Sequence, residues 1–170
     1  ATSILVLVDY QTRLMPSIHE GESAIASALF LAKVAQALEI PILGTEQNPE
    51  GLGPNDERIK QFCSQTLVKH SFNAAADGLV DSIKAINPKI SQIVLAGCEA
   101  HVCLMQTALG LLDTGYELAL VAEASGSRLP QDKQLALDRF ARQGVALLGA
   151  EMLAFEWLKT SEHPQFKNIL

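Results

Sequence analysis

The sequence predicts an α/β fold, a three-layer αβα sandwich around a six-stranded, mostly parallel sheet of the Rossmann-like kind. Short apolar runs alternate with longer stretches whose apolar residues recur at helical spacing. The apolar runs are continuous rather than alternating, as expected for strands covered on both faces. No repeat, linker or change of composition divides residues 1–170, so the sequence predicts one domain.

Six apolar runs are the expected strands. The first, SILVLV, contains no charged residue, and Pro41 opens the second at its edge. The expected strands are residues 3–8, 41–45, 66–71, 92–97, 117–124 and 145–150. Their alternation with helical stretches argues for a parallel sheet with helices on both faces.

The stretches between the strands have helical apolar spacing. Pro88, Gly115 and Gly144 follow three of them and act as stop signals. The expected helices are residues 22–38, 57–63, 74–86, 102–113, 132–143 and 151–159. Residues 46–55 are rich in Pro, Gly and Asn and predict a loop, and an irregular tail is expected from residue 161 onward.

Charge and composition narrow the possible partners. The net charge is −6 and no cluster of Lys or Arg is present, so neither a nucleic-acid nor a membrane partner is expected. No apolar run approaches the roughly 20 residues needed to span a bilayer. Three cysteines do not predict a disulfide framework, and the opening ATSILVLVDY lacks secretory features. These features predict a cytoplasmic protein.

The carboxyl ends of the predicted strands carry the residues whose side chains could take part in a reaction. Asp9 follows the first strand, Lys69 ends the third, and Cys103 lies in the first turn of the helix after the fourth. Ligands bind at this edge of parallel sheets. Lys69 and the helix end would lower the pKa of the thiol, Asp9 would accept its proton, and backbone N–H groups would receive an oxyanion.

Each of these residues also has a purely structural explanation. A strand-end aspartate commonly caps a turn, a strand-end lysine is often solvated, and a cysteine in an apolar helix often behaves as a small buried hydrophobe. Four residues separate Cys98 from Cys103, which is not the C-x-x-C redox spacing. Cys98, His101 and Cys103 offer three soft metal ligands but no second cluster completes a zinc site, so His101 is expected to give local support. No P-loop, dinucleotide-binding glycine motif or G-x-S-x-G elbow is present.

Three segments resemble the isochorismatase-like cysteine hydrolases. They are LVDYQ (7–11), LVKHSFNA (67–74) and LAGCEAHVCLMQTALGLLDTGYELALVAEASGSR (95–128), and they occur in the order of the family. The tail GAEMLAFEWLKTSEHPQFKNIL is similar to the subgroup of isochorismatase domain-containing proteins. The resemblance implies that Cys103 is the nucleophile, Asp9 the general base and Lys69 the third member of the triad.

The resemblance also implies the surroundings of the nucleophile. It places a cis peptide at Cys98–Glu99 and assigns the oxyanion to the backbone N–H groups of Glu99 and Cys103. It further implies that Gln11 and Phe72 line the substrate pocket, following the D-x-Q and K-x-x-F patterns of the family.

One departure from the family narrows the substrate. Nicotinamidases of this family carry an Asp-x-His pair after the second strand, where this chain has Glu46 and Gln47 in TEQNPEGLG. No metal or other cofactor is therefore expected, and the intact Cys103 favours C–N hydrolysis of a small amide over vinyl-ether hydrolysis. A homo-oligomer is expected from the apolar helix surfaces. The alternative is a binding or scaffold module of the same fold with weak or absent catalysis.

Overall fold

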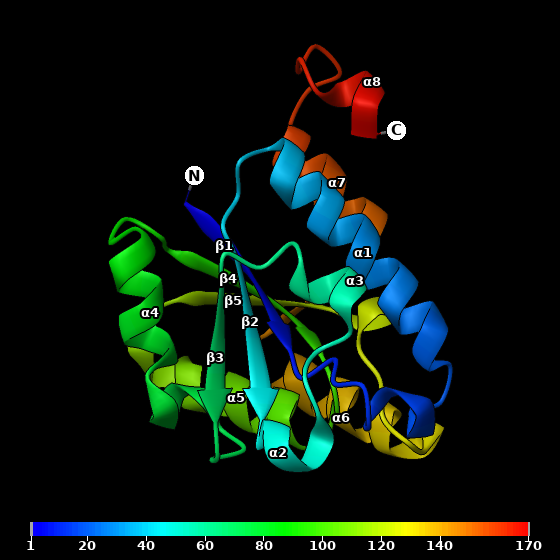
Figure 1. Cartoon of the computed structure of the whole chain (residues 1–170). Helices are drawn as coiled ribbons and strands as arrows, with labels where there is room; N and C mark the ends of the chain where they lie inside the picture. The colour runs from blue at the N-terminus through cyan, green and yellow to red at the C-terminus, as the bar shows by residue number, and fades with distance from the viewer. Residues whose placement is uncertain (1, 170) are drawn as a thin grey trace.

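A computed structural model describes residues 2–169 and contains one six-stranded sheet (Figure 1). All strands are parallel, in the order β3-β2-β1-β4-β5-β6. The strands are β1 (Ser3–Val8), β2 (Ile42–Gln47), β3 (Gln65–Lys69), β4 (Gln92–Gly97), β5 (Glu117–Val121) and β6 (Ala146–Leu148). The predicted α/β class and the six predicted strands are confirmed, and the sheet is wholly parallel.

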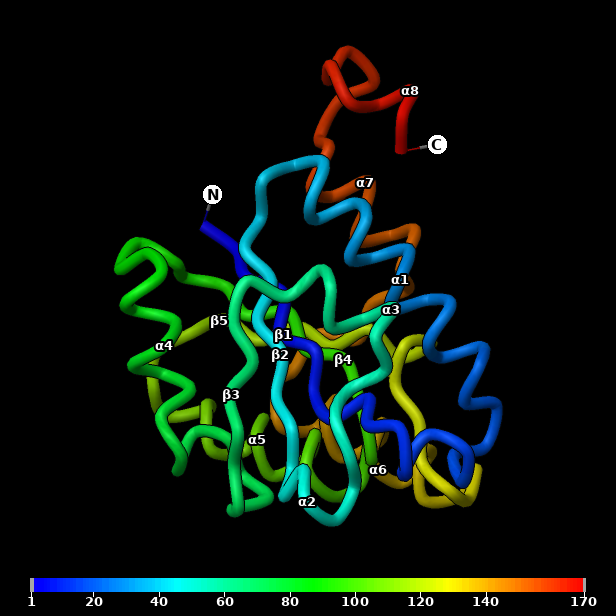
Figure 2. Tube along the Cα trace, in the orientation of Figure 1, coloured from blue at the N-terminus to red at the C-terminus, as the bar shows by residue number. Residues whose placement is uncertain are grey.

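Helices cover both faces of the sheet, which completes three layers (Figures 1 and 2). The α-helices are α1 (Gly21–Ala37), α2 (Pro49–Leu52), α3 (Glu57–Lys60), α4 (Leu79–Ile86), α5 (Cys103–Leu111), α6 (Pro130–Arg142), α7 (Ala150–Leu158) and α8 (Phe166–Ile169). Short 3-10 turns are η1 (Met15–Ser17), η2 (Ala74–Asp77), η3 (Leu112–Thr114) and η4 (Ala122–Ala124). Helices α4, α5 and α6 pack on one face, and α1, α3 and α7 pack on the other.

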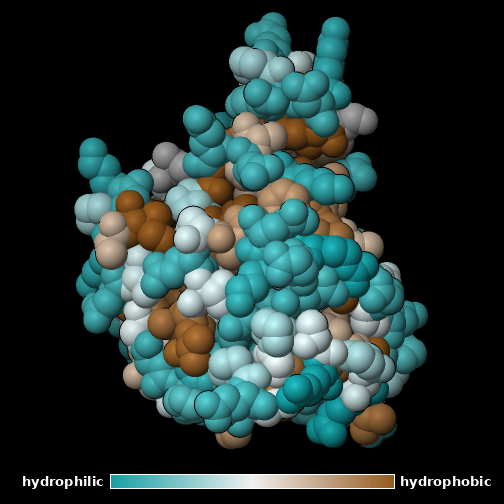
Figure 3. Space-filling model, in the orientation of Figure 1, coloured by the Kyte–Doolittle hydropathy of each residue, from teal (hydrophilic) through white to brown (hydrophobic). Residues whose placement is uncertain are grey.

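Strand β1 is the centre of both hydrophobic layers. Ile4 and Val6 face the layer that contains α4, α5 and α6, whereas Leu5 and Leu7 face the layer that contains α1. Every residue of β1 is buried, which explains why SILVLV has no polar alternation. On the face shown in Figure 3, polar side chains cover most of the surface and the exposed apolar ones form separate small groups.

Several predicted boundaries differ from the structure for local reasons. The helix expected over residues 74–86 is divided at Gly78, whose φ of 99° ends η2 before α4 begins. The expected loop at 46–55 contains the end of β2 and the short helix α2, because Pro49 starts a helical turn. Strand β5 ends at Val121 and continues as the 3-10 turn η4. The short final helix α8 falls within the expected irregular tail.

The register of the sheet brings the predicted site residues to one edge. Val8 is level with Thr45 on β2 and with Gly97 on β4, and Gln47 is level with Lys69. The carboxyl ends of β1, β2, β3 and β4 therefore meet at one place. Within residues 2–169, no helix is long and apolar enough to cross a membrane.

Candidate active site

A buried ion pair occupies the carboxyl edge of the sheet. The Nζ of Lys69 lies 2.8 Å from Oδ2 of Asp9, and the two side chains are 0% and 1% exposed. The other carboxylate oxygen of Asp9 accepts a hydrogen bond of 2.7 Å from the Thr45 hydroxyl. Asp9 has a φ of 54°, a left-handed conformation that turns the chain out of β1. Burial without a partner would be costly for either charge, so the pair holds both side chains in place.

Gln47 connects this ion pair to the cysteine. Its Oε1 accepts a hydrogen bond of 2.7 Å from Nζ of Lys69, and its Nε2 donates to the carbonyl oxygen of His70 at 2.7 Å. The Sγ of Cys103 lies 3.9 Å from the same Oε1. Asp9, Lys69, Gln47 and Cys103 thus form one continuous buried polar group.

Cys103 is the first residue of α5 and is 7% exposed. Burial, together with the negative charge of Asp9, raises its pKa to about 12, and the positive charge of Lys69 offsets only part of this rise. Lys69 lowers the thiol pKa, as expected, but the expected net lowering is wrong because burial and Asp9 outweigh this effect. At neutral pH the resting group is the thiol, and a base must take its proton before the sulfur can act as a nucleophile.

The turn before Cys103 presents two backbone donors. The peptide bond between Cys98 and Glu99 is cis. The carbonyl oxygen of Glu99 accepts hydrogen bonds from the N–H groups of Val102 and Leu104, at 3.0 and 3.2 Å. Over residues 2–169, no protein group accepts a hydrogen bond from the N–H of Glu99 or of Cys103. Backbone donors with no internal partner at a helix start are suited to binding an anion.

The segment after η4 holds this turn from the outside. The Glu99 carboxylate accepts hydrogen bonds from the backbone N–H and the Nε of Arg128, at 3.0 and 3.1 Å. The N–H of Ala100 donates to the carbonyl oxygen of Gly126 at 2.7 Å. His101 lies with Nδ1 2.8 Å from the Ser127 hydroxyl, which agrees with the expected local supporting role.

A cavity of about 350 Å³ opens over this group. Phe72 lines it and is 51% exposed, held by the hydrogen bond from the Thr107 hydroxyl of α5 to its carbonyl oxygen. Gln11 does not line the cavity. It is fully buried, and its side-chain amide bonds instead to the backbone of Gln47 and of Gly53. These hydrogen bonds connect the end of β2 to the loop that follows α2. The lining residues are Asp9, Arg13, Leu14, Ser17, Gln47, Leu52, Phe72, Glu99, Val102, Cys103 and Arg128.

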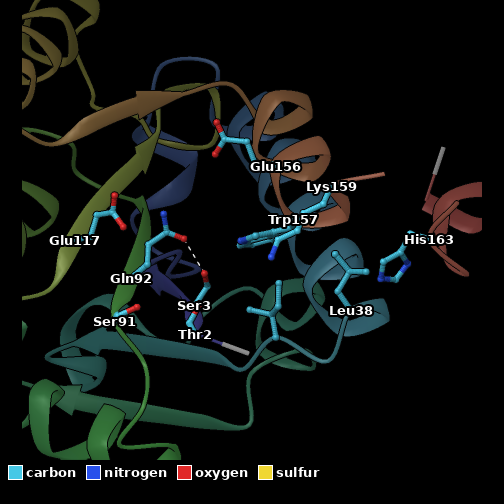
Figure 4. Close-up of a pocket in the computed structure, with 11 residues that line it drawn as sticks. Thr2, Ser3, Leu38, Ser91, Gln92, Glu117, Glu156, Trp157, Lys159 and His163 are labelled. Atoms are coloured by element: carbon cyan, nitrogen blue, oxygen red, sulfur yellow. Dashed lines mark hydrogen bonds between the residues drawn. The ribbon is translucent and has the colours of Figure 1, made fainter. Parts of the chain in front are cut away.

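A second cavity, of about 450 Å³, lies at the amino ends of β1, β4 and β5 (Figure 4). Trp157 projects into it from α7, and Ser3 donates a hydrogen bond of 2.7 Å to Gln92 on its sheet side. Among the lining residues there is no cysteine and no buried ion pair. The buried ion pair and Cys103 lie instead at the carboxyl ends of the strands. The lining residues are Thr2, Ser3, Leu38, Ile40, Ser91, Gln92, Glu117, Glu156, Trp157, Lys159 and His163.

Glu46, which follows Thr45 on β2, uses its carboxylate for contacts with α3 and the loop before it. Its carboxylate accepts hydrogen bonds from the N–H of Asn55 at 2.7 Å and from Nζ of Lys60 at 3.1 Å. In the part of the chain that the structure describes, no three His, Cys, Asp or Glu side chains are grouped so that they could hold a metal ion.

The fold and this site define an α/β protein with a cysteine at the carboxyl edge of a parallel sheet. The isochorismatase domain family matches residues 3–152, so the chain belongs to the isochorismatase family. Isochorismatase domain-containing protein 2 of Xenopus laevis is 34% identical over 168 residues, which cover 99% of this chain and 82% of that protein. The expected family and subgroup are confirmed.

Solved structures with the same fold include two proteins of different description. The MAR1 ribonuclease of Caenorhabditis elegans has a TM-score of 0.92 and 29% identity, over 99% of this chain and 87% of its own. The YcaC gene product of Escherichia coli, an octameric hydrolase of unknown specificity, has a TM-score of 0.85 and 23% identity, over 99% of this chain and 91% of its own. The second similarity is evidence of a shared fold alone.

Several residues of the site were not assigned to it from the sequence, among them Thr45, Gln47, Arg13 and Arg128. Thr45 and Gln47 lie at the end of β2, beside Asp9 in the structure. The signal in the sequence that points to them is their place at the carboxyl end of an expected strand. Arg13 and Arg128 reach the cavity from two loops. The geometry of those loops depends on tertiary hydrogen bonds, which the sequence does not display.

Proposed function

We propose that this protein is a cysteine hydrolase that cleaves the C–N bond of a small amide through a thioester on Cys103. The observation that carries the proposal is the buried Asp9–Lys69 pair beside Cys103, in a cavity of about 350 Å³. A cavity of this size suits a small molecule. A buried charge pair in contact with a thiol is costly to maintain, which is typical of a functional site.

The proposed reaction begins with proton transfer from Cys103 to Asp9. The thiolate attacks the carbonyl carbon of the amide, and the N–H groups of Glu99 and Cys103 donate to the resulting oxyanion. The C–N bond then breaks as Asp9 returns the proton to the departing nitrogen, which leaves as ammonia or an amine. Water, losing a proton to Asp9, hydrolyses the thioester and releases a carboxylic acid, and the proton returns to sulfur.

Lys69 contributes to this cycle through its contacts with Asp9 and Gln47. It lies 2.8 Å from Asp9 and 2.7 Å from Oε1 of Gln47, so it orients the base toward the cysteine and stabilises the negative charge that develops on sulfur. The raised pKa of Cys103, about 12, supports a mechanism that needs a base, because the thiol must lose its proton before the sulfur attacks.

Intact-mass spectrometry and product analysis with a panel of small amides test this mechanism. The wild type should release a carboxylic acid and transiently gain the mass of the acyl group, whereas Cys103→Ser and Asp9→Asn should lose turnover by at least about a hundredfold. Unchanged turnover in both variants would refute it. A short RNA belongs in the panel, because one similar protein is named a ribonuclease.

The alternative of a binding or scaffold module predicts a different result. In that case Cys103 should label with iodoacetamide no faster than Cys63, whose pKa burial raises to about 11, and no amide should be turned over. Faster labelling of Cys103 than of Cys63 at pH 8 would favour the hydrolase, because it would show a sulfur that is reachable and reactive despite its higher pKa.

A homo-oligomer is part of the proposal. Leu147 of the edge strand β6 and Met152 and Phe155 of α7 are exposed apolar residues, and the similar E. coli protein is an octamer. Light scattering should give a mass above that of one chain, and Phe155→Glu should reduce it. The three free cysteines support a reducing compartment such as the cytoplasm.

A further inference from the structure

Arg13 lies at the mouth of the active-site cavity and is held by backbone carbonyl groups. Its Nη1 donates to the carbonyl oxygens of Glu50 and Gly51, at 3.2 and 3.1 Å, and its backbone N–H donates to that of Leu52 at 3.0 Å. These carbonyls belong to the short helix α2. Gly53, with a φ of 77°, follows this helix; a Cβ there would clash with Oγ1 of Thr12 at 2.5 Å, whereas Cγ of Arg13 would lie at an ordinary contact distance of 3.6 Å.

The charge of Arg13 is not compensated, whereas the other charges of the cavity are paired. Asp9 pairs with Lys69, and Glu99 pairs with Arg128. Among residues 2–169, no carboxylate lies within ion-pair distance of Arg13, and its Nε and Nη2 have no protein acceptor. The cavity therefore carries an excess positive charge in a chain whose net charge is −6.

An arginine fixed through one nitrogen keeps two parallel donors for a planar anion. A carboxylate accepts such a pair of hydrogen bonds in a bidentate arrangement. Leu14, Leu52, Phe72 and Val102 line the cavity together with Arg13, so the part of a ligand between its anionic end and Cys103 would contact mainly apolar side chains.

We propose that Arg13 binds a carboxylate on the substrate, so that the substrate class is small amides that carry a carboxylate. The inference rests on the proposed function for the position of the amide at Cys103, but the anion site itself does not depend on the thiol chemistry. Recognition at Arg13 would also orient the substrate, because it fixes the end remote from the scissile bond.

The affinities of N-acetylglycine and its uncharged methylamide for the full chain test this proposal. They are measured by NMR titration in the wild type and in Cys103→Ala, in which no acyl transfer occurs. The acid should bind about tenfold more tightly than the methylamide, since hydrogen bonds to charged groups contribute about that factor. Arg13→Gln should remove the preference, and Arg13→Lys should keep part of it.

Arg142→Gln is the matched control, because it removes the same charge from an exposed position on α6 and should leave the preference unchanged. Equal affinities for the two ligands in the wild type would overturn the proposal, as would a preference that survives in Arg13→Gln or no binding of either ligand. A preference for the acid in a protein that turns over no amide would refute the hydrolase mechanism and leave the anion site standing.

Discussion

Lys69 and Asp9 form an ion pair of 2.8 Å from which solvent is almost completely excluded. The two residues are sixty positions apart in the chain and meet because β1, β2 and β3 are neighbours in the sheet. A pair of this kind stabilises little relative to an apolar pair of the same shape, but it is costly to break. The sheet therefore maintains a buried charge pair beside Cys103 at an expense in stability that a purely structural core would avoid.

We expect single substitutions of the pair to destabilise the fold more than the double substitution does. Lys69→Met or Asp9→Leu alone leaves one buried charge unpaired and should lower the free energy of unfolding by roughly 3–5 kcal/mol. The double variant should recover most of this loss while lacking activity. Urea denaturation of the four proteins measures the cycle. Additive losses would show that the two side chains are not coupled.

A substitution of Gln47 tests its place between the ion pair and the cysteine. Gln47→Leu removes an acceptor for Lys69 and a neighbour of Sγ of Cys103. Stability should fall by about 1–3 kcal/mol, and kcat should fall more than KM rises, because the loss acts on the reacting group. Gln61→Leu, at an exposed position outside the cavity, is the control. An unchanged kcat would show that Gln47 has no role in the reaction.

The sequence was sufficient to predict the strands, their parallel arrangement and the edge at which Asp9, Lys69 and Cys103 meet. These follow from apolar patterns and from the rule that ligands bind at the carboxyl ends of parallel strands. The sequence did not predict the pKa of Cys103, because burial and the distances to Asp9 and Lys69 set it. It also misplaced Gln11, whose amide is used within the loop after β2. Such outcomes depend on tertiary distances that local patterns do not contain.

Gly97 is required by the close approach of β4 to β1. Its φ is 148°, and a Cβ at this position would overlap the carbonyl oxygen of Val8. That carbonyl group cannot shift without moving the neighbouring Asp9 or Cys98, whose N–H donates a hydrogen bond to it. Gly97→Ala should therefore cost at least about 4 kcal/mol or prevent folding.

The matched control for Gly97 is Gly115, which has a φ of 86° but open space where a Cβ would lie. Gly115→Ala should cost only about 1 kcal/mol, from backbone strain alone. Thermal and urea unfolding compare the two variants. Similar losses in both would mean that conformation, rather than the contact with Val8, determines the requirement for glycine.

The reactivity of Cys103 toward iodoacetamide should depend on pH in a way that identifies Asp9. Because the pKa of Cys103 is raised to about 12, the thiolate fraction is small at pH 8 and the rate should rise about tenfold for each pH unit up to pH 10.

Asp9→Asn removes a negative charge that raises this pKa, so the pKa should fall and labelling at pH 8 should become faster. Turnover of an amide should be lost in the same variant, because the proposed general base is gone. Asp113→Asn, on the 3-10 turn η3, is the control and should change neither rate. Peptide mapping after timed labelling gives the rate at each cysteine. Slower labelling of Cys103 in Asp9→Asn would show that the charge of Asp9 does not raise the pKa of the thiol.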